Sequence, residues 1–340
     1  MPARALCVAS FVLAAATPIR GYAKPLLAVS AEAGGEIVLV DPATTQVVER
    51  IKVGVRPRGL KASKDGRRLV VALAGPPKTA AKPGTPAAPV TAGVAVVDVA
   101  TRKVARQIAI SPAPFGIDLL PDGKTAFVSN SETNEVFAID LVAGSVKKKL
   151  GVGAEPQAVA VRPDGKVVYV ATHGSDEVSA IDPKTVTLLG RIDAGPHPQT
   201  VLFAPRGDTA VATDEGAPVV TIVDTKKHTF KEQFVLQGLP KTTPPAALQS
   251  AVFAPDGKHL YVTTGGGKSV LIVDLAKKAA VGTIDGVGAF PRGIAISADG
   301  KKLYTANGAS NDVAIIDIAS KKVEARIAVP GGPWGLVLLK

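Results

Sequence analysis

The sequence repeats one pattern seven times: an apolar run, a short polar loop, and a second apolar run that ends in aspartate. The clearest copy, LYTANGASNDVAIID, lies at 303–317. Successive terminal aspartates are 57, 42, 42, 42, 50 and 43 residues apart: Asp41, Asp98, Asp140, Asp182, Asp224, Asp274 and Asp317. A period in the low forties, made of short β-rich runs, is typical of a β-propeller with four strands per blade. The pattern therefore predicts an all-β fold of seven blades, each with four antiparallel strands.

The repeat at 291–329 shows where the four strands of a blade fall. We expect them at 293–297, 303–307, 313–317 and 323–329. The first three are apolar at nearly every residue, which indicates a sheet covered on both faces by neighbouring blades. The fourth alternates apolar and charged residues, as an outer strand exposed on one side does. The aspartate that ends the third strand can accept hydrogen bonds from backbone N–H groups two residues on, and so begin a turn.

The two ends of the repeat region predict how the ring closes. Residues 26–31 align with the second strand of a blade and have no first strand before them. Residues 334–340 align with a first strand and have no second strand after them. The last strand is therefore expected to complete the first blade, which removes two open sheet edges.

Residues 1–23 read as a secretory signal peptide, and 24–340 as the propeller. A short apolar run at 5–16 follows one positive charge and precedes small residues, so cleavage after Ala16 or Ala23 fits equally well. The only cysteine, Cys7, lies in this segment, so the mature chain has no thiol for a disulfide or metal. No later stretch reaches the length of a membrane span. We expect a periplasmic or secreted monomer without a transmembrane anchor.

The formal net charge is +11, with lysines scattered at turns, and only 4% of residues are aromatic. Scattered lysines are typical of solvated turns and sheet edges. The export signal and the low aromatic content argue against nucleic acid as a partner. No motif for a cofactor is present, and we expect none.

Aromatic-small-small-polar steps occur near the end of several second strands, as in Tyr261-Val262-Thr263-Thr264 and Tyr304-Thr305-Ala306-Asn307. Pro-Asp-Gly turns lie at 121–123, 163–165 and 255–257. With these motifs, residues 26–340 resemble the YVTN (Tyr-Val-Thr-Asn) β-propeller repeat family. The resemblance implies an exported or surface propeller, and some members look like companions of periplasmic quinoprotein or cytochrome systems.

Each first strand is entered through a Pro-x-Gly-like step, and the x position is expected at the mouth of the central channel. In blade order the x residues are Trp334, Arg58, Phe115, Gln157, Gln199, Gln249 and Arg292. A basic and aromatic arc would then face an arc of glutamines. Such an arrangement suits a planar anionic ligand, held by bidentate arginine bonds and ring stacking. The alternative is that these side chains only fill the channel mouth.

Two histidines, His173 and His197, fall in loops of neighbouring blades on the same face, and Asp214 ends a strand nearby. These three residues suggest a small metal or acid–base site, although histidines in surface turns are common. Two insertions, at 75–92 and 237–247, are also expected on this face, here called the top. Insertions on one face of a repeat fold often mark the binding face.

These features favour a non-enzymatic protein that binds an anionic small molecule or a periplasmic partner protein on its top face. The first alternative is a propeller enzyme of the lactonase, hydrolase or lyase type that uses the two histidines and Asp214. The second is an accessory protein of a periplasmic quinoprotein or cytochrome system. The fold alone does not decide among them.

Overall fold

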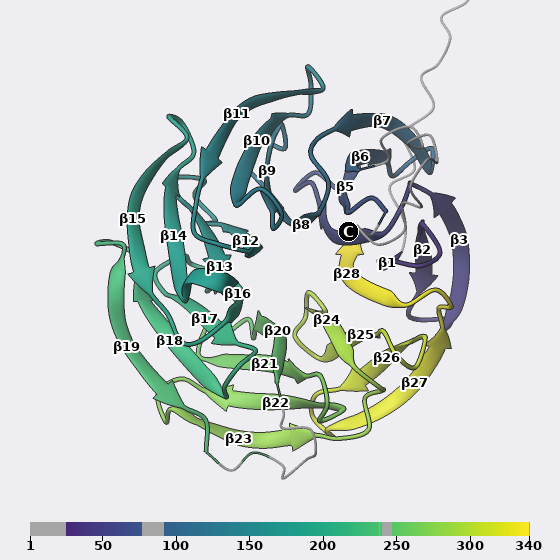
Figure 1. Cartoon of the computed structure of the whole chain (residues 1–340). Coiled ribbons are helices and arrows are strands. Elements are labelled where there is room, and N and C mark those ends of the chain that lie inside the picture. The colour runs from purple at the N-terminus through teal and green to yellow at the C-terminus, as the bar shows by residue number, and fades with distance from the viewer. Residues whose placement is uncertain (1–24, 77–91, 238, 240–246, 340) are drawn as a thin grey trace, which may run out of the picture.

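The computed structural model describes residues 25–76, 92–237, 239 and 247–339. In this part of the chain, seven four-stranded antiparallel sheets stand side by side in a ring, as Figure 1 shows. The prediction of an all-β propeller with seven blades is confirmed. The expected signal segment, 1–23, and most of both insertions lie outside the described residues. In the described part, no helix has the length and apolar character needed to cross a membrane.

The C-terminal strand closes the ring as the repeat alignment predicts. The first blade has the strand order β28-β1-β2-β3, so the last strand is the innermost strand of the first blade. Leu338 lies opposite Leu27, and Leu336 lies opposite Val29 in this pairing. Figure 1 shows β28 in yellow beside the purple β1. This seam joins the first and last strands of the described part of the chain, so that each covers what would otherwise be an open sheet edge of the other.

The innermost strands line the channel, and six of the seven begin with proline, which is tolerated at the first residue of a strand. They are β28 (Pro333–Leu339), β4 (Pro57–Ala62), β8 (Pro114–Leu119), β12 (Pro156–Val161), β16 (Pro198–Phe203), β20 (Leu248–Phe253) and β24 (Pro291–Ile296).

The second and third strands are buried on both faces, as their continuous apolar runs predict. The second strands are β1 (Leu26–Ala31), β5 (Arg68–Leu73), β9 (Thr125–Asn130), β13 (Val168–Thr172), β17 (Ala210–Asp214), β21 (His259–Thr264) and β25 (Lys302–Asn307). The third strands are β2 (Glu36–Asp41), β6 (Gly93–Asp98), β10 (Glu135–Asp140), β14 (Glu177–Asp182), β18 (Val219–Asp224), β22 (Ser269–Asp274) and β26 (Asp312–Asp317).

The outermost strands alternate exposed and partly buried residues, and a turn begun by aspartate leads into each. In blade 3, Asp140 Oδ1 accepts the N–H groups of Val142 and Ala143 at 2.9 and 2.8 Å. The strands are β3 (Gln46–Lys52), β7 (Lys103–Ala109), β11 (Ser145–Gly151), β15 (Thr187–Asp193), β19 (Thr229–Val235), β23 (Ala279–Ile284) and β27 (Lys322–Ala328).

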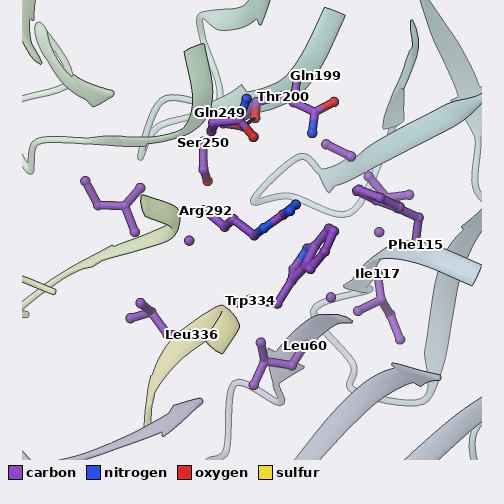
Figure 2. Close-up of a pocket in the computed structure, with 17 residues that line it drawn as sticks. Leu60, Phe115, Ile117, Gln199, Thr200, Gln249, Ser250, Arg292, Trp334 and Leu336 are labelled. Atoms are coloured by element: carbon purple, nitrogen blue, oxygen red, sulfur yellow. Dashed lines mark hydrogen bonds between the residues drawn. The ribbon is translucent and has the colours of Figure 1, made fainter. Parts of the chain in front are cut away.

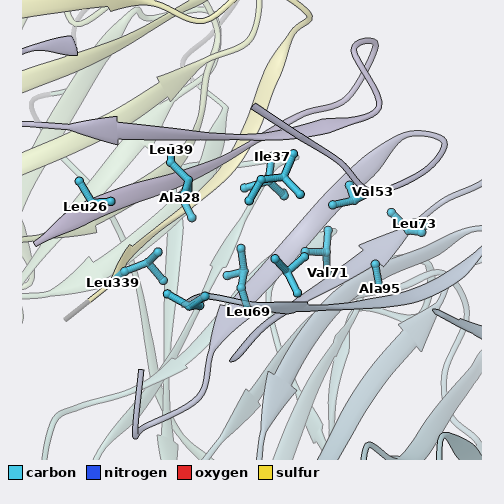
Figure 3. Close-up of a cluster of buried hydrophobic side chains, with 13 residues drawn as sticks. Leu26, Ala28, Ile37, Leu39, Val53, Leu69, Val71, Leu73, Ala95 and Leu339 are labelled. Carbon is cyan, nitrogen blue, oxygen red and sulfur yellow. The ribbon is translucent and has the colours of Figure 1, made fainter. Parts of the chain in front are cut away.

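The core consists of apolar layers between adjacent blades. In the layer between blades 1 and 2, Leu26 and Leu39 pack against Leu69 and Val71, and Leu339 of the closing strand joins them (Figure 3). Fully burying one such side chain contributes roughly 1.5–3 kcal/mol. Because each blade presents two apolar faces, no blade can bury them without both neighbours, and the ring is one cooperative unit.

Candidate functional site

Three positions of every blade meet on the top face: the residue before the innermost strand, the x residue inside it, and the residue after the second strand. The N–H of the residue after the second strand donates to the carbonyl oxygen of the residue before the innermost strand, at 3.0–3.2 Å in all seven blades. The donor and acceptor pairs are Glu32 and Gly332, Ala74 and Arg56, Ser131 and Ala113, His173 and Glu155, Glu215 and His197, Gly265 and Ala247, and Gly308 and Phe290. These residues and the seven x residues form what we call the mouth.

Small residues after x let the innermost strands approach closely. A Cβ on Gly59 would lie 2.5 Å from the carbonyl oxygen of Phe115, and one on Gly293 would lie 2.7 Å from that of Trp334. At Gly59 and Gly293, glycine is therefore required by contact between neighbouring backbones. In blade 5 the position holds Thr200, whose hydroxyl donates to the carbonyl oxygen of Gln249 at 2.9 Å. The Pro-x-Gly step thus fixes the x side chains at the end of a rigid strand.

The predicted basic and aromatic arc forms one continuous stack. The guanidinium of Arg58 lies 5.2 Å from the centre of the Phe115 ring and 4.5 Å from that of Trp334. The guanidinium of Arg292 lies 3.7 Å from Trp334 and 4.6 Å from Phe290. Each guanidinium is therefore held between two aromatic rings, an arrangement that stabilises a cation through the ring quadrupole. Figure 2 shows Arg292 lying along the Trp334 ring.

The two arginines of the stack differ in their partners. Arg58 Nε donates to Glu32 Oε1 at 2.9 Å, and Arg56 Nη2 lies 3.0 Å from the same oxygen. For Arg292, the described part of the chain offers no hydrogen bond or ion pair, only the two aromatic contacts. Burial lowers the pKa of both Arg58 and Arg292, and the Glu32 carboxylate opposes this in each. Arg292 is thus a half-buried cation with no anion in direct contact.

The three predicted glutamines lie together in the mouth, and one of them connects to an acidic residue. Gln249 Nε2 donates to Glu215 Oε1 at 2.9 Å. The Oε1 atoms of Gln157 and Gln199 are buried and accept no hydrogen bond from the described residues. Of these two glutamines, Gln199 is among the residues that line the central cavity.

His173 and His197 come together as the sequence predicts, and two glutamates complete the cluster. Their rings stack with centres 4.7 Å apart. His173 lies between carboxylates, with Nδ1 3.3 Å from Glu155 Oε2 and Nε2 3.4 Å from Glu215 Oε2. His197 Nδ1 lies 3.9 Å from Asp176 Oδ1. An imidazole beside carboxylates is a common arrangement for moving protons.

Asp214 lies apart from this cluster. Its side chain is fully buried, and neither carboxylate oxygen has a hydrogen-bond partner among the described residues. Burial raises the pKa of Asp214 to about 7, and repulsion from Asp176 adds to the effect. The described residues contain no group of three or more His, Cys, Asp and Glu residues suited to hold a metal ion. A metal bound by His173, His197 and Asp214 stays a prediction.

A cavity of about 210 Å³ lies at the centre of the mouth. Phe115, Arg292 and Trp334 form one wall, and Gln199 and Gln249 form another (Figure 2). Glu215 joins the two predicted groups of residues, because it contacts both Gln249 and His173, and its charge also acts on Arg292. The arginine arc and the histidine cluster are therefore parts of one site.

Sequence reasoning missed Glu32 and Glu215 as site residues. Both occupy the position directly after the second strand, as His173 does. Comparing that position across the seven repeats would have found them, because it is polar or small in each blade: Glu32, Ala74, Ser131, His173, Glu215, Gly265 and Gly308.

Two family models match adjacent parts of the chain, each covering less than half of it. The choice-of-anchor I domain matches residues 25–171, and the seven-bladed β-propeller lactonase family matches residues 190–327. Neither is the YVTN repeat family, so of that resemblance only the β-propeller itself is supported. None of the curated proteins matches the sequence.

Solved structures share the fold across most of the chain. A putative 6-phosphogluconolactonase from Bacteroides fragilis has a TM-score of 0.75 at 16% identity, covering 95% of this chain and 100% of its own. The periplasmic gluconolactonase of Pseudomonas aeruginosa has a TM-score of 0.73 at 20% identity, covering 93% and 99%. Hydrazine synthase from Kuenenia stuttgartiensis has a TM-score of 0.72 at 24% identity, covering 86% and 92%.

The lactonase family model matches the half of the chain that carries Glu215, Gln249 and Arg292. This finding overturns the expectation of a non-enzymatic binding protein and favours the alternative of a lactonase-type enzyme. The chain is therefore a seven-bladed β-propeller whose second half resembles the propeller lactonases.

Proposed function

We propose that the protein is a lactonase, which hydrolyses a cyclic ester to a hydroxy acid in the mouth of the propeller. The proposal rests on one observation. Gln249 and His173 both contact Glu215, and Arg292, which has no ion-pair partner among the described residues, lies in the same mouth. These contacts put a candidate base close to a candidate oxyanion partner: Arg292 and Gln249 line the cavity, and Glu215 is joined to it through Gln249. The lactonase model at 190–327 and the two lactonase structures with this fold support it.

The reaction needs a base to activate water and a positive group to stabilise the developing oxyanion. Gln249 and His173 hold Glu215 in place. The pair of Glu215 and His173 takes a proton from a water molecule, and the oxygen of that water adds to the carbonyl carbon of the lactone. Arg292 stabilises the negative charge that forms on the carbonyl oxygen. The ring C–O bond then breaks, and the pair of Glu215 and His173 returns the proton that it took from water to the released alkoxide, which becomes the hydroxyl of the product.

The mouth also suits the rest of a small lactone. Gln199 and Gln249 line the cavity together with Arg292, and side-chain amides of this kind pair with the hydroxyl groups of a substrate. The cavity of about 210 Å³ is below the range of about 300–1,000 Å³ that holds drug-sized ligands. A compact single-ring lactone suits this volume.

The test is hydrolysis of a panel of lactones by the purified protein, followed in a pH-stat by the acid released. The panel contains glucono-δ-lactone, 6-phosphogluconolactone, and simple γ- and δ-lactones. We expect Glu215→Gln to lower kcat by about 10²–10⁴-fold and Arg292→Met to lower it by about 10²–10³-fold.

The matched controls are Glu324→Gln and Arg206→Met, which make the same changes outside the mouth, in an ion pair with Lys302 and in one with Asp208. Both controls should keep wild-type rates. Absence of hydrolysis across the panel, or equal rates in the mouth variants and their controls, would contradict the proposal.

We also propose a periplasmic location and a monomeric state. The predicted signal at 1–23 and the fold shared with the periplasmic gluconolactonase support the location. N-terminal sequencing of protein recovered from the periplasm should begin at residue 17 or 24, and light scattering should give the mass of one chain. A partner redox protein, the second alternative, stays a prediction.

A further inference from the structure

We propose that Glu32 makes the mouth selective for substrates with at most one negative charge, and that its carboxylate repels a second charge. This inference rests on the proposed function, since it defines the class of lactone: neutral, or carrying a single carboxylate, and not a phosphate monoester. It assigns Glu32 the role of a specificity-determining residue that takes no part in bond breaking.

Glu32 is held in a fixed position by the seam that closes the ring. Its backbone N–H donates to the carbonyl oxygen of Gly332 at 3.1 Å, and that of Ala33 donates to Gly331 at 2.8 Å. Its Oε1 accepts from Arg58 Nε at 2.9 Å and from Arg56 Nε at 3.1 Å. The carboxylate is therefore ordered before any ligand arrives, and no rearrangement is needed for it to act on one.

The arginines beside Glu32 are already paired, whereas Arg292 is not. Both Arg56 and Arg58 contact the same oxygen of Glu32, and its second oxygen has no hydrogen-bond or ion-pair partner among the described residues. An incoming anion can therefore pair with only one arginine, Arg292, because the carboxylate of Glu32 already pairs with the other two arginines.

The formal charges of the mouth balance without a ligand when its two histidines are counted as neutral. Arg56, Arg58 and Arg292 contribute three positive charges, while Glu32, Glu155 and Glu215 contribute three negative ones. Of the two carboxylates that act on Arg292, Glu32 has the larger effect on its pKa, ahead of Glu215. One bound negative charge is matched by Arg292, but a second charge has no partner and lies in the field of Glu32.

Trp334 provides a direct readout, because it is the only tryptophan in the chain and both guanidiniums lie against its ring. The probes are methanesulfonate and sulfate, which are both tetrahedral and differ by one charge, with dimethyl sulfone as the uncharged control. Binding is measured by Trp334 fluorescence at constant ionic strength. This measurement needs no turnover, so it is judged separately from the lactonase proposal.

In the wild-type protein we expect sulfate to bind no more tightly than methanesulfonate. Coulomb energy is proportional to ligand charge, so removing the charge of Glu32 changes the binding energy of a dianion twice as much as that of a monoanion. The factor by which affinity increases should therefore be squared for the dianion. We expect Glu32→Gln to strengthen methanesulfonate binding about threefold and sulfate binding about tenfold, the latter being about 1.4 kcal/mol. Glu32→Asp keeps the charge and should keep the wild-type preference.

A purely structural role for Glu32 predicts a different result, in which both anions bind equally better or equally worse in Glu32→Gln. That outcome, or tight sulfate binding by the wild-type protein, overturns the proposal. Arg292→Met should abolish the fluorescence response to both anions, and a response that persists also overturns it. Folding of Glu32→Gln is checked by far-UV circular dichroism. If this variant does not fold, the relative affinities of the wild-type protein and of Glu32→Asp for the two anions still test the proposal.

Discussion

Replacing Asp214 with asparagine should stabilise the protein, and the gain should grow as the pH rises. The Asp214 side chain is fully buried and neither oxygen accepts a hydrogen bond from a described residue. Asn130 occupies the equivalent position in blade 3, where its Nδ2 donates to the carbonyl oxygen of Ser111 at 3.0 Å. In blade 5, Gly195 stands where Ser111 does, and Asp214 Oδ2 packs against it. The amide of Asp214→Asn can therefore donate to the carbonyl oxygen of Gly195.

The magnitude follows from the raised pKa. Asp214 has a pKa of about 7 in the folded protein against a usual value of 3.8. Between these values the folded state holds a proton that the unfolded state has lost, so the free energy of unfolding falls as pH rises. The loss begins near pH 4 and is complete above about pH 8. Three pH units correspond to about 4 kcal/mol, of which about 3 kcal/mol falls between pH 5 and pH 8.

The assay is thermal unfolding of both proteins from pH 5 to pH 9. The difference in Tm between Asp214→Asn and the wild type should widen by roughly 5 °C between pH 5 and pH 8, and stay constant above. Asp193→Asn, which removes an exposed carboxylate from the end of β15, is the matched control for the loss of one negative charge. A difference that stays flat with pH, or narrows as pH rises, would refute the assignment of a protonated buried carboxyl at Asp214.

Three further predictions test the site and the core. His173→Asn should lower kcat for lactone hydrolysis by at least about tenfold with little change in Tm, because it removes one partner of Glu215, as steady-state kinetics would show. Leu27→Ala should lower the free energy of unfolding by about 2–5 kcal/mol in urea titration, since the side chain is fully buried at the closing seam. Gly308→Glu should place a carboxylate beside Arg292 and so lower kcat/KM, and a variant with unchanged kinetics would speak against Arg292 as the anion partner.

The fold could be predicted because each repeat contains an aspartate at the same place, which aligns the seven blades with one another. Seven aspartates that end third strands set the blade number, and each of them begins the turn that was expected of it, as Asp140 does. The closing strand followed from the alignment of the two ends, and the pairing of Leu338 with Leu27 confirms it. The hydrophobic layers between blades are regular, so the strand positions assigned in one clear repeat apply to the other six.

The site could be predicted only in part, because a change of one residue at a strand end reverses the direction of a side chain. Asp214 and Glu215 are adjacent acids at the end of β17, and sequence reasoning chose Asp214 as the partner of the histidines. The structure shows that Asp214 ends the strand and faces inward, whereas Glu215 begins the loop and contacts His173. The sequence pattern placed the end of the strand correctly at Asp214, but it did not show which way the side chains of Asp214 and Glu215 point. The x positions escaped this problem because proline marks the start of nearly every innermost strand.

The position after the second strand shows how a symmetric ring acquires an asymmetric site. Where this position holds Glu32, the neighbouring Arg58 is neutralised by an ion pair. Where it holds Gly265 and Gly308, there is no carboxylate, and a Cβ on Gly308 would lie only 3.3 Å from Arg292 Nε. A half-buried guanidinium without an anion is less stable than a paired one, and the aromatic rings on both sides offset part of that cost. Glycine at these two positions therefore leaves room for the Arg292 side chain and places no carboxylate beside it, so its charge stays free for the anion-binding role that we propose.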